Sequence, residues 1–437
     1  MVESLIGFGV LLLLILLRMP IAFAMALVGF VGFGLQRGWD AALSMVAQTT
    51  FDSGLSYSLS VVPLFILMGN LVTRAGLSQE LYEATYALLG RFRGGLAMAS
   101  VAACGGFSAV CGSSLATAAT MSKVAMPSMR RYGYADSLAA GSIAAGGTLG
   151  ILIPPSVLMV IYGIMTETDI AKLFIAGIVP GILGVGFYAA AVAVVTRLRP
   201  ELGPRGERFG LGATLRALKG AWGVTLLFAV IMGGIYGGVF TPTEAAGVGA
   251  AIAFVFALAK GGLNLPILFQ LLLESARTTA MIFMVLIGAL IFTNFVNFAG
   301  LPDVLAETVA ELSLNPYLVV ALIIGIYILL GCVLESLSMI LLTVPVFYPI
   351  MLELDFGAEL DPESLLIWFA IIVLVVTEIS LITPPVGLNV FVLRGVLRDV
   401  ELGTIFRGVT PFWIADIFRV ALLVALPALS LFLPALM

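Results

Sequence analysis

Long apolar segments limit what this chain can fold into more than any other feature. They recur along its whole length, and each holds roughly twenty residues, enough to cross a hydrocarbon core about 30 Å thick as a helix. Of the 437 residues, 61% are hydrophobic and only 11% are charged, whereas a soluble protein of this length needs a far more charged surface. The sequence therefore predicts an all-α polytopic membrane protein, because helices satisfy their own backbone groups in lipid.

Residue usage excludes several classes of function. The chain has no histidine, which excludes His-based catalysis and most zinc sites. Its three cysteines, Cys104, Cys111 and Cys332, form no CxxC motif, so neither a structural disulfide nor a sulfur-bound metal is expected. The net charge of −4 is too small to indicate a nucleic-acid partner. Because a GxSxG motif and a metal-ligand pair are also missing, we expect neither an enzyme nor a bound cofactor.

The apolar segments form two series separated by a polar connector. The connector, residues 198–220, is rich in Lys and Arg and contains Pro200 and Pro204, so we expect it to be exposed to solvent. It divides the chain into a first unit, 1–197, and a second unit, 221–437. Six apolar segments are expected in each unit: 4–17, 20–36, 54–74, 95–127, 138–165 and 170–197, then 221–238, 242–260, 275–299, 317–350, 366–393 and 411–434.

The two units match each other weakly but in the same order. Asn70 corresponds to Asn294, and Pro154-Pro155 corresponds to Pro384-Pro385, at offsets of 224 and 230 residues. A collinear series of matches at a nearly constant offset predicts an internal repeat.

Charge placement predicts that the two repeats are inverted in the membrane. Basic residues flank segment 95–127, whereas no Lys or Arg occurs between Arg277 and Arg394, around segment 317–350. Because positive residues mark the cytoplasmic face, the two segments should open on opposite sides. We therefore expect Arg130 and the connector in the cytoplasm, Glu359 in the periplasm, and both termini on the periplasmic side of a bacterial inner membrane.

Segments 95–127 and 317–350 are too long for a single crossing, and each has a middle of small or polar residues. One interpretation is a re-entrant helical hairpin whose tip stops within the membrane, which is tolerated where the tip lines a polar cavity. The alternatives are two short helices with an exposed turn, or one long tilted helix. Whichever of these is right, the apolar segment that follows each of them contains a double proline.

That feature is a double proline in the middle of an apolar span, Pro154-Pro155 in segment 138–165 and Pro384-Pro385 in segment 366–393. Two consecutive prolines remove two amide donors and disfavour the helical turn before them. The preceding carbonyls then need other partners, and a bound Na⁺ is one of them. A kinked helix patched by Ser or Thr hydroxyls is the alternative. Interrupted helices at matching positions of two repeats favour the first interpretation, since transporters bind their substrates there.

Oxygen atoms near the hairpin tips and the double prolines are the candidate Na⁺ ligands, because hard cations prefer oxygen. One ion is expected between the first hairpin and the first break, and the other between the second hairpin and the second break. The predicted sodium-binding residues are Ser108, Gly112, Ser113, Gly150, Ile153 and Ser156 for the first ion, and Gly331, Leu334, Glu335, Ser380, Thr383 and Val386 for the second. Ser114, Thr117 and Asn389 are predicted to face the substrate between the two ions.

Two acidic residues inside apolar segments leave alternatives open. Glu378 would be costly if it faced lipid, so it either takes the charge of a cation or a proton, or pairs with a distant basic residue. Glu335 lies in the middle of the second predicted hairpin and allows the same two interpretations. The stretch from Thr241 to Glu244, by contrast, is typical of a turn that opens a helix, with Pro242 in the first turn.

Three motifs in this chain resemble the large membrane subunit of TRAP transporters, the tripartite ATP-independent periplasmic systems. They are Gly237-Gly238-Val239-Phe240-Thr241-Pro242-Thr243-Glu244-Ala245, Gly150-Ile151-Leu152-Ile153-Pro154-Pro155-Ser156 and Thr383-Pro384-Pro385-Val386-Gly387-Leu388-Asn389. The resemblance runs from about Pro20 to Thr410. The chain departs from the commoner pattern at the second hairpin, where Glu335-Ser336 stands in place of Asp-Pro.

The resemblance implies an elevator-type Na⁺ symporter that takes up an organic acid, such as a dicarboxylate or a sialic acid. In such systems the hairpins and broken helices form a mobile unit that carries the substrate past a fixed scaffold. The implied partners are a small four-helix membrane subunit and a periplasmic substrate-binding protein. An elevator-type Na⁺ or H⁺ symporter that works without a binding protein is the alternative.

Overall fold

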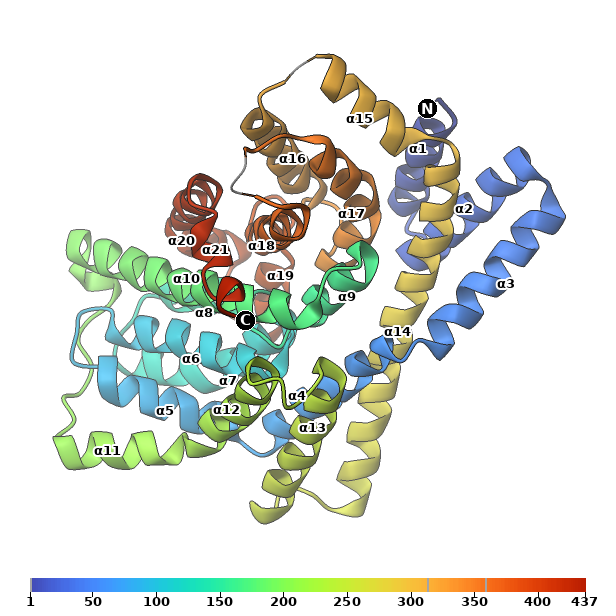
Figure 1. Cartoon of the computed structure of the whole chain (residues 1–437). Coiled ribbons are helices and arrows are strands. Elements are labelled where there is room, and N and C mark those ends of the chain that lie inside the picture. Colours follow the sequence, from blue (N-terminus) through green and yellow to red (C-terminus); the bar gives the residue numbers. More distant parts are fainter. Residues whose placement is uncertain (1, 313, 358–359) are drawn as a thin grey trace.

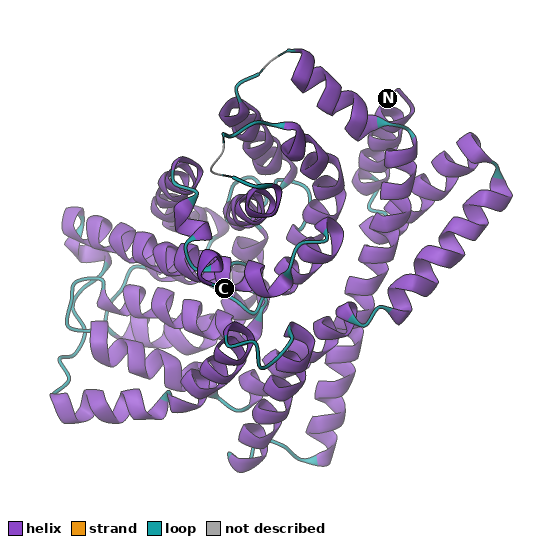
Figure 2. Cartoon of the chain, viewed as in Figure 1, coloured by secondary structure: helices purple, strands orange, loops and turns teal. Residues whose placement is uncertain are grey.

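The chain is helical throughout the part that can be described. The computed structural model describes residues 2–312, 314–357 and 360–437, and over these ranges it contains α-helices and short 3-10 turns without a strand (Figure 2). The prediction of an all-α protein is therefore confirmed. Glu359, which the charge pattern assigned to the periplasm, lies outside the described residues.

The helices are long and apolar enough for a polytopic membrane protein. Within the described ranges, six single helices have the length and composition to cross a membrane, and the number rises to eight if each of two bent pairs forms one span. The bent pairs are 39–55 with 58–74, and 211–220 with 222–236, with bends of 60° and 51°. The predicted apolar segments include only the second helix of the first pair, as segment 54–74. The first helix, α3 (Trp39–Leu55), is not among them, because it carries Asp40 and Asp52.

One side of the molecule is built on a very long helix, α14 (Leu265–Phe298), which has 34 residues and is therefore about 51 Å long at 1.5 Å per residue. Figure 1 shows it in yellow, running past the helices of the N-terminal part. Its main contact is with α2 (Ile21–Arg37), where a β-carbon on Gly288 would lie 2.3 Å from the carbonyl oxygen of Ala22. α14 also packs against α3, α4 (Val61–Arg74) and α17, while α1 (Val2–Leu16) lies against α2.

The charged connector is largely exposed, but it is not an irregular loop. It contains α11 (Leu211–Gly220), which packs against α5 (Leu77–Leu89). Backbone hydrogen bonds fix the residues before α11, since Gly94 N donates to Gly203 O and Gly206 N donates to Gly90 O, both at 2.9 Å. The connector therefore holds the base of the first hairpin on one side and leads into α12 (Trp222–Tyr236) on the other.

The turn before α13 (Pro242–Ala259) has the structural role that its sequence predicted. Thr241 caps the helix: its hydroxyl accepts a hydrogen bond from Glu244 N at 3.3 Å. The Glu244 carboxylate in turn accepts one from Thr241 N at 2.8 Å, which completes a capping box.

Both long segments with weak middles are helical hairpins in the structure. α6 (Gly95–Cys111) is followed by α7 (Ser114–Arg131), and α16 (Pro316–Leu330) is followed by α17 (Ser336–Glu353). α7 and α17 extend beyond the predicted ends at 127 and 350, and their three prolines lie inside the helices: Pro127, Pro345 and Pro349. A proline removes one amide donor and kinks a helix without necessarily ending it when tertiary packing supports it.

Both double prolines lie in gaps between helices. The first gap, residues 149–156, separates α8 (Asp136–Thr148) from α9 (Val157–Thr166). The second, residues 381–387, separates α18 (Pro362–Ser380) from α19 (Leu388–Val396). We call these gaps the first break and the second break.

The second half of each broken helix packs on the hairpin of the other unit. α9 contacts α17 and α18, and α19 contacts α7 and α8. α20 (Leu402–Ala425) packs along α8, and α10 (Ile170–Leu198) packs against α6, α18 and α20. Figure 1 shows the hairpins and broken helices gathered in this part of the molecule, away from most of α14. α15 (Leu301–Glu311) joins α14 to the second hairpin and packs against α17.

Candidate ion and substrate site

The tip of the first hairpin is a tight turn that exposes backbone groups. α6 ends at Cys111, and Gly112 follows with φ +63°, a left-handed conformation that favours glycine. Ser113 then caps α7, its hydroxyl accepting a hydrogen bond from Ala116 N at 3.3 Å. The turn leaves Ser113 exposed and Ser114 buried.

This tip lies directly against the first break. A β-carbon on Gly150 would be 3.2 Å from Ser108 Oγ and 3.2 Å from Ser114 N, and one on Gly112 would be 3.3 Å from Pro155 O. The structure therefore brings together the tip and break residues that the sequence assigned to one ion.

Several oxygen atoms at this contact have no hydrogen-bond donor. The hydroxyls of Ser108 and Ser156 are fully buried and unpartnered in the described structure. No donor among the described residues lies on the carbonyl oxygens of residues 150–155, since the local amides bond to residues 146–149 instead. Buried polar groups are nearly always paired, so this cluster of free oxygens has the composition of a hard-cation site.

The tip of the second hairpin packs against the last residue of α18 and against the second break, and more tightly than the first tip does. A β-carbon on Gly331 would lie 2.1 Å from Ser380 Cβ, so only glycine fits there. Ser380 donates a hydrogen bond to Val376 O at 3.0 Å, and Cys332 Sγ lies 3.7 Å from Pro384 O. The carbonyls of residues 331–334 receive no donor from the described residues.

The other residues predicted for the second ion have mixed surroundings. Leu334 is buried, and the Glu335 carboxylate accepts a hydrogen bond from the Ser338 hydroxyl at 3.0 Å. The Thr383 hydroxyl donates to Ile379 O at 2.6 Å and accepts from Trp413 Nε1 at 2.9 Å. Val386 is half-buried. Glu335 therefore has no basic partner in the described chain, and Thr383 keeps one lone pair for a further contact.

The residues predicted to face the substrate lie where the two units meet. Asn389, at the start of α19, donates from Nδ2 to Ala144 O of α8 at 3.1 Å, while its Oδ1 is buried without a partner. The Thr117 hydroxyl of α7 is also buried and unpartnered, and Ser114 is buried at the start of the same helix. Because α19 packs on α7, these three residues come from adjoining helices.

Glu378 belongs to a fully buried charged cluster, and it is the one member that the sequence analysis names. Glu378 pairs with Arg419, which is one of the two outcomes that the sequence left open. Arg419 also pairs with Asp416 at 2.9 Å, and Tyr188 donates a hydrogen bond to Asp416 at 2.6 Å. The signal for Arg419 and Asp416 was present, because they are two charges three residues apart within the apolar segment 411–434.

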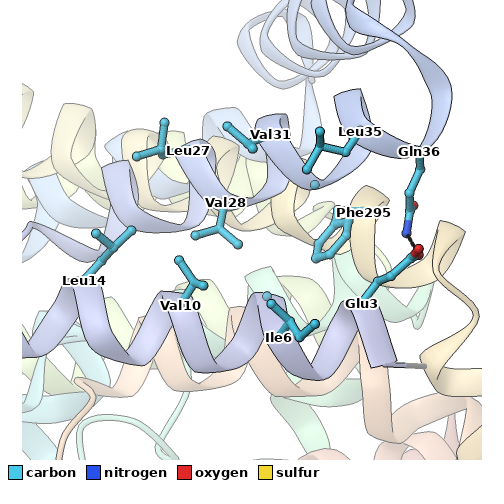
Figure 3. Close-up of a pocket in the computed structure, with 12 residues that line it drawn as sticks. Glu3, Ile6, Val10, Leu14, Leu27, Val28, Val31, Leu35, Gln36 and Phe295 are labelled. Atoms are coloured by element: carbon cyan, nitrogen blue, oxygen red, sulfur yellow. Dashed lines mark hydrogen bonds between the residues drawn. The ribbon is translucent and has the colours of Figure 1, made fainter.

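An apolar groove lies elsewhere in the described structure. It has a volume of about 490 Å³ and runs between α1 and α2, with a hydrogen bond between Gln36 and Glu3 at one end (Figure 3). Its lining is otherwise aliphatic or aromatic and contains none of the predicted site residues. The groove is therefore not a candidate for the ion or substrate site.

Comparison with known proteins identifies the family. The family model described as "Tripartite ATP-independent periplasmic transporter, DctM component" matches residues 8–429. The chain belongs to this family. It is thus a TRAP transporter large permease, a membrane transport subunit and not an enzyme, as the three motifs and the missing catalytic residues predicted.

Two relatives of this TRAP permease illustrate the match. It is 38% identical to the C4-dicarboxylate TRAP transporter large permease protein DctM of Pseudomonas aeruginosa, over 89% of each chain. It is 31% identical to the sialic acid TRAP transporter large permease protein SiaM of Vibrio cholerae, over 100% of this chain and 99% of the relative. In fold it is similar to the YdaH transporter of Alcanivorax borkumensis, with a TM-score of 0.60 and 15% identity over 89% and 88% of the chains.

Proposed function

We propose that this permease couples the inward movement of Na⁺ to the uptake of an organic acid across the bacterial inner membrane. The observation that carries the proposal is the pairing of each helix break with a hairpin tip. At both places, backbone carbonyls lie in an apolar protein without donors, and the first also has the free hydroxyls of Ser108 and Ser156. Half-helices that end within a membrane are typical of ion and substrate sites in secondary transporters.

The substrate is expected between the two ion sites. There Ser114, Thr117 and Asn389 offer hydroxyl and amide groups that can hydrogen-bond a carboxylate. The relatives are described as permeases for a C4-dicarboxylate and for sialic acid, and both substrates are carboxylates. An organic acid is therefore the substrate class that we propose.

The hairpins and broken helices, α6–α9 and α16–α19, would form the unit that moves. The long α14 with α2, α3 and α4 would form the scaffold, in two inverted repeats that face opposite sides of the membrane. By the tripartite organisation in the family's description, the partners would be a small four-helix membrane subunit and a periplasmic binding protein that delivers the acid.

Replacing Na⁺ by K⁺ at the same imposed membrane voltage should abolish uptake into proteoliposomes that contain this permease and its two partners. K⁺ is too large for sites shaped around Na⁺. The replacement therefore removes the coupling ion, while the membrane voltage stays the same. The initial rate of uptake of a radiolabelled C4-dicarboxylate measures this. Uptake that persists without Na⁺ and follows a pH gradient would instead support the alternative, an H⁺ symporter that uses Glu335.

Ser108→Ala should raise the Na⁺ concentration needed for half-maximal uptake. Deleting one oxygen ligand costs about 1–3 kcal/mol, or roughly a 5- to 150-fold loss of affinity. Ser100→Ala is the matched control, because Ser100 lies on the same helix, is equally buried, and already donates to Leu96 O at 2.8 Å. An identical Na⁺ dependence in both variants would remove Ser108 from the ion site.

The inverted topology can be tested by cysteine labelling in a variant without the three native cysteines. Arg131→Cys should react with a membrane-impermeant maleimide only from the cytoplasmic side, and Glu353→Cys only from the periplasmic side. Both positions are exposed, and neither makes an ion pair within the described chain, so the substitutions disturb little. Labelling of both cysteines from the same side would contradict the inverted arrangement.

A further inference from the structure

A pocket with three arginines lies where the end of α10 meets the base of the first hairpin. It has a volume of about 460 Å³. Its arginines come from three different segments: Arg93 from the turn before α6, Arg197 from the last turn of α10, and Arg205 from the connector. The rest of the lining is mostly apolar and includes Leu89, Phe92, Met98 and Ala193.

The three arginines have no acidic partner within the described chain. The ion pairs there use Arg130, Lys172, Lys260 and Arg419 as their cations, and none of the pocket arginines. The two acids of the connector, Glu201 and Glu207, do not line the pocket, and Glu207 accepts a hydrogen bond from the Tyr132 hydroxyl at 2.5 Å. The pocket is therefore strongly positive.

The backbone holds two of these charges next to each other. Arg93 and Arg205 lie opposite one another in an isolated antiparallel β-bridge. Residues directly opposite in such a pair have β-carbons roughly 4.5–5.5 Å apart, and like charges at that spacing repel. An anion bound between the two guanidinium groups would replace this repulsion by attraction. A phosphate group fits best, because the planar guanidinium can donate two parallel hydrogen bonds to it.

The surroundings of the pocket favour a lipid over a soluble phosphate ester. α10 is long and apolar enough to span a membrane, so Arg197 in its last turn lies at a membrane surface. Val194 and Leu198, on the neighbouring part of α10, are 57% and 77% exposed. They offer an apolar surface to an acyl chain beside the arginines, which a soluble ester could not use. Basic pockets between membrane helices are typical binding sites for anionic headgroups.

We propose that the pocket of Arg93, Arg197 and Arg205 binds the phosphodiester headgroup of an anionic phospholipid, with an acyl chain along the exposed apolar residues of α10. The bound headgroup would join the base of the first hairpin, the end of α10 and the connector. This inference goes beyond the proposed function and does not depend on it, because the lipid is neither the transported substrate nor the coupling ion.

Native mass spectrometry of the full-length permease, stripped of lipid in a neutral detergent, tests the proposal. Phosphatidylglycerol should bind roughly 10-fold more tightly than phosphatidylcholine, whose headgroup carries no net charge. Raising the salt concentration should weaken the binding of phosphatidylglycerol, because salt screens exposed charges. Glycerophosphoglycerol, the same headgroup without acyl chains, should bind more weakly than the lipid.

Two triple variants show whether the lipid uses this pocket. Arg93→Gln with Arg197→Gln and Arg205→Gln should weaken the binding of phosphatidylglycerol by about 100-fold, at roughly 5-fold for each arginine. The matched control is Arg199→Gln with Arg208→Gln and Lys219→Gln. It removes the same number of positive charges from exposed positions in the same region, but outside the pocket, and should bind the lipid like the wild type.

Three results would overturn the proposal. Equal losses in the two triple variants would mean that net charge, and not this pocket, attracts the lipid. Equal affinity of the wild type for phosphatidylglycerol and phosphatidylcholine would mean that the arginines do not recognise an anion. Binding of glycerophosphoglycerol as tightly as the lipid would assign the pocket to a soluble phosphate ester. If the pocket triple variant does not fold, the single variants Arg93→Gln and Arg197→Gln should each lose roughly 5-fold, and loss in neither would contradict the site.

Discussion

Gly331→Ala should weaken the apparent affinity for Na⁺ by roughly 100-fold, close to the upper end of the ~1–3 kcal/mol that overpacking costs. The added β-carbon would lie 2.1 Å from Ser380 Cβ, which is attached directly to the backbone of α18 and cannot swing away. The hairpin tip and the second break would have to separate, and the carbonyls on both sides would no longer face one ion. Uptake rates measured over a range of Na⁺ concentrations, at equal amounts of protein in the membrane, give the affinity.

Gly325→Ala is the matched control for this substitution. Gly325 lies on the same helix, α16, and a β-carbon there would have no neighbour within 4 Å. It should leave the Na⁺ dependence unchanged. The double variant Gly331→Ala with Ser380→Gly should recover most of the affinity. Residue 331 gains a β-carbon and residue 380 loses the one that it would clash with. Wild-type Na⁺ dependence in Gly331→Ala alone would show that the second tip and break do not form an ion site.

The helix breaks could be predicted from the sequence because their cause is local. Two prolines remove two amide donors wherever they stand, so Pro154-Pro155 and Pro384-Pro385 interrupt their spans in any context. The ends of the hairpins are less local. The sequence predicts an end of the first hairpin at Pro127, but α7 continues to Arg131 because the packing of α7 against α8 and α6 holds the helix together.

The ordered path of the connector could not be predicted from composition. Its charges predicted exposure, and most of it is exposed. Its ordered path depends on backbone hydrogen bonds such as that from Gly206 to Gly90, and backbone pairing over such a distance leaves no trace in composition.

The candidate site could be predicted in part from the sequence, because the predicted repeat pairs each hairpin with the break that follows it in the chain. The contact of Ser108 with Gly150, and that of Gly331 with Ser380, followed from that placement. The partner of Glu378 did not follow, because Arg419 lies 41 residues away and no pattern joins the two. Pairing between distant helices depends on how they pack, which single-sequence patterns do not encode.

Arg419→Met should be the most destabilising single substitution considered. Removing one partner of a buried ion pair costs about 3–5 kcal/mol, because the remaining charge stays buried without compensation. The variant should therefore yield little folded protein and a strongly lowered midpoint of thermal unfolding in detergent. Arg407→Met is the matched control: Arg407 lies on the same helix, α20, but it is exposed and makes no ion pair within the described chain.

Second substitutions distinguish which carboxylate needs Arg419. Arg419→Met with Asp416→Asn removes one of the two carboxylates that pair with Arg419, and should recover part of the lost stability. Arg419→Met with Glu378→Gln leaves Asp416 with its hydrogen bond from Tyr188, and should therefore recover more. The comparison uses three unfolding midpoints, those of Arg419→Met and of the two double variants, measured in the same detergent. A larger rescue by Asp416→Asn than by Glu378→Gln would contradict this order, and equal stability of Arg419→Met and Arg407→Met would mean that the buried pair is not needed for the fold.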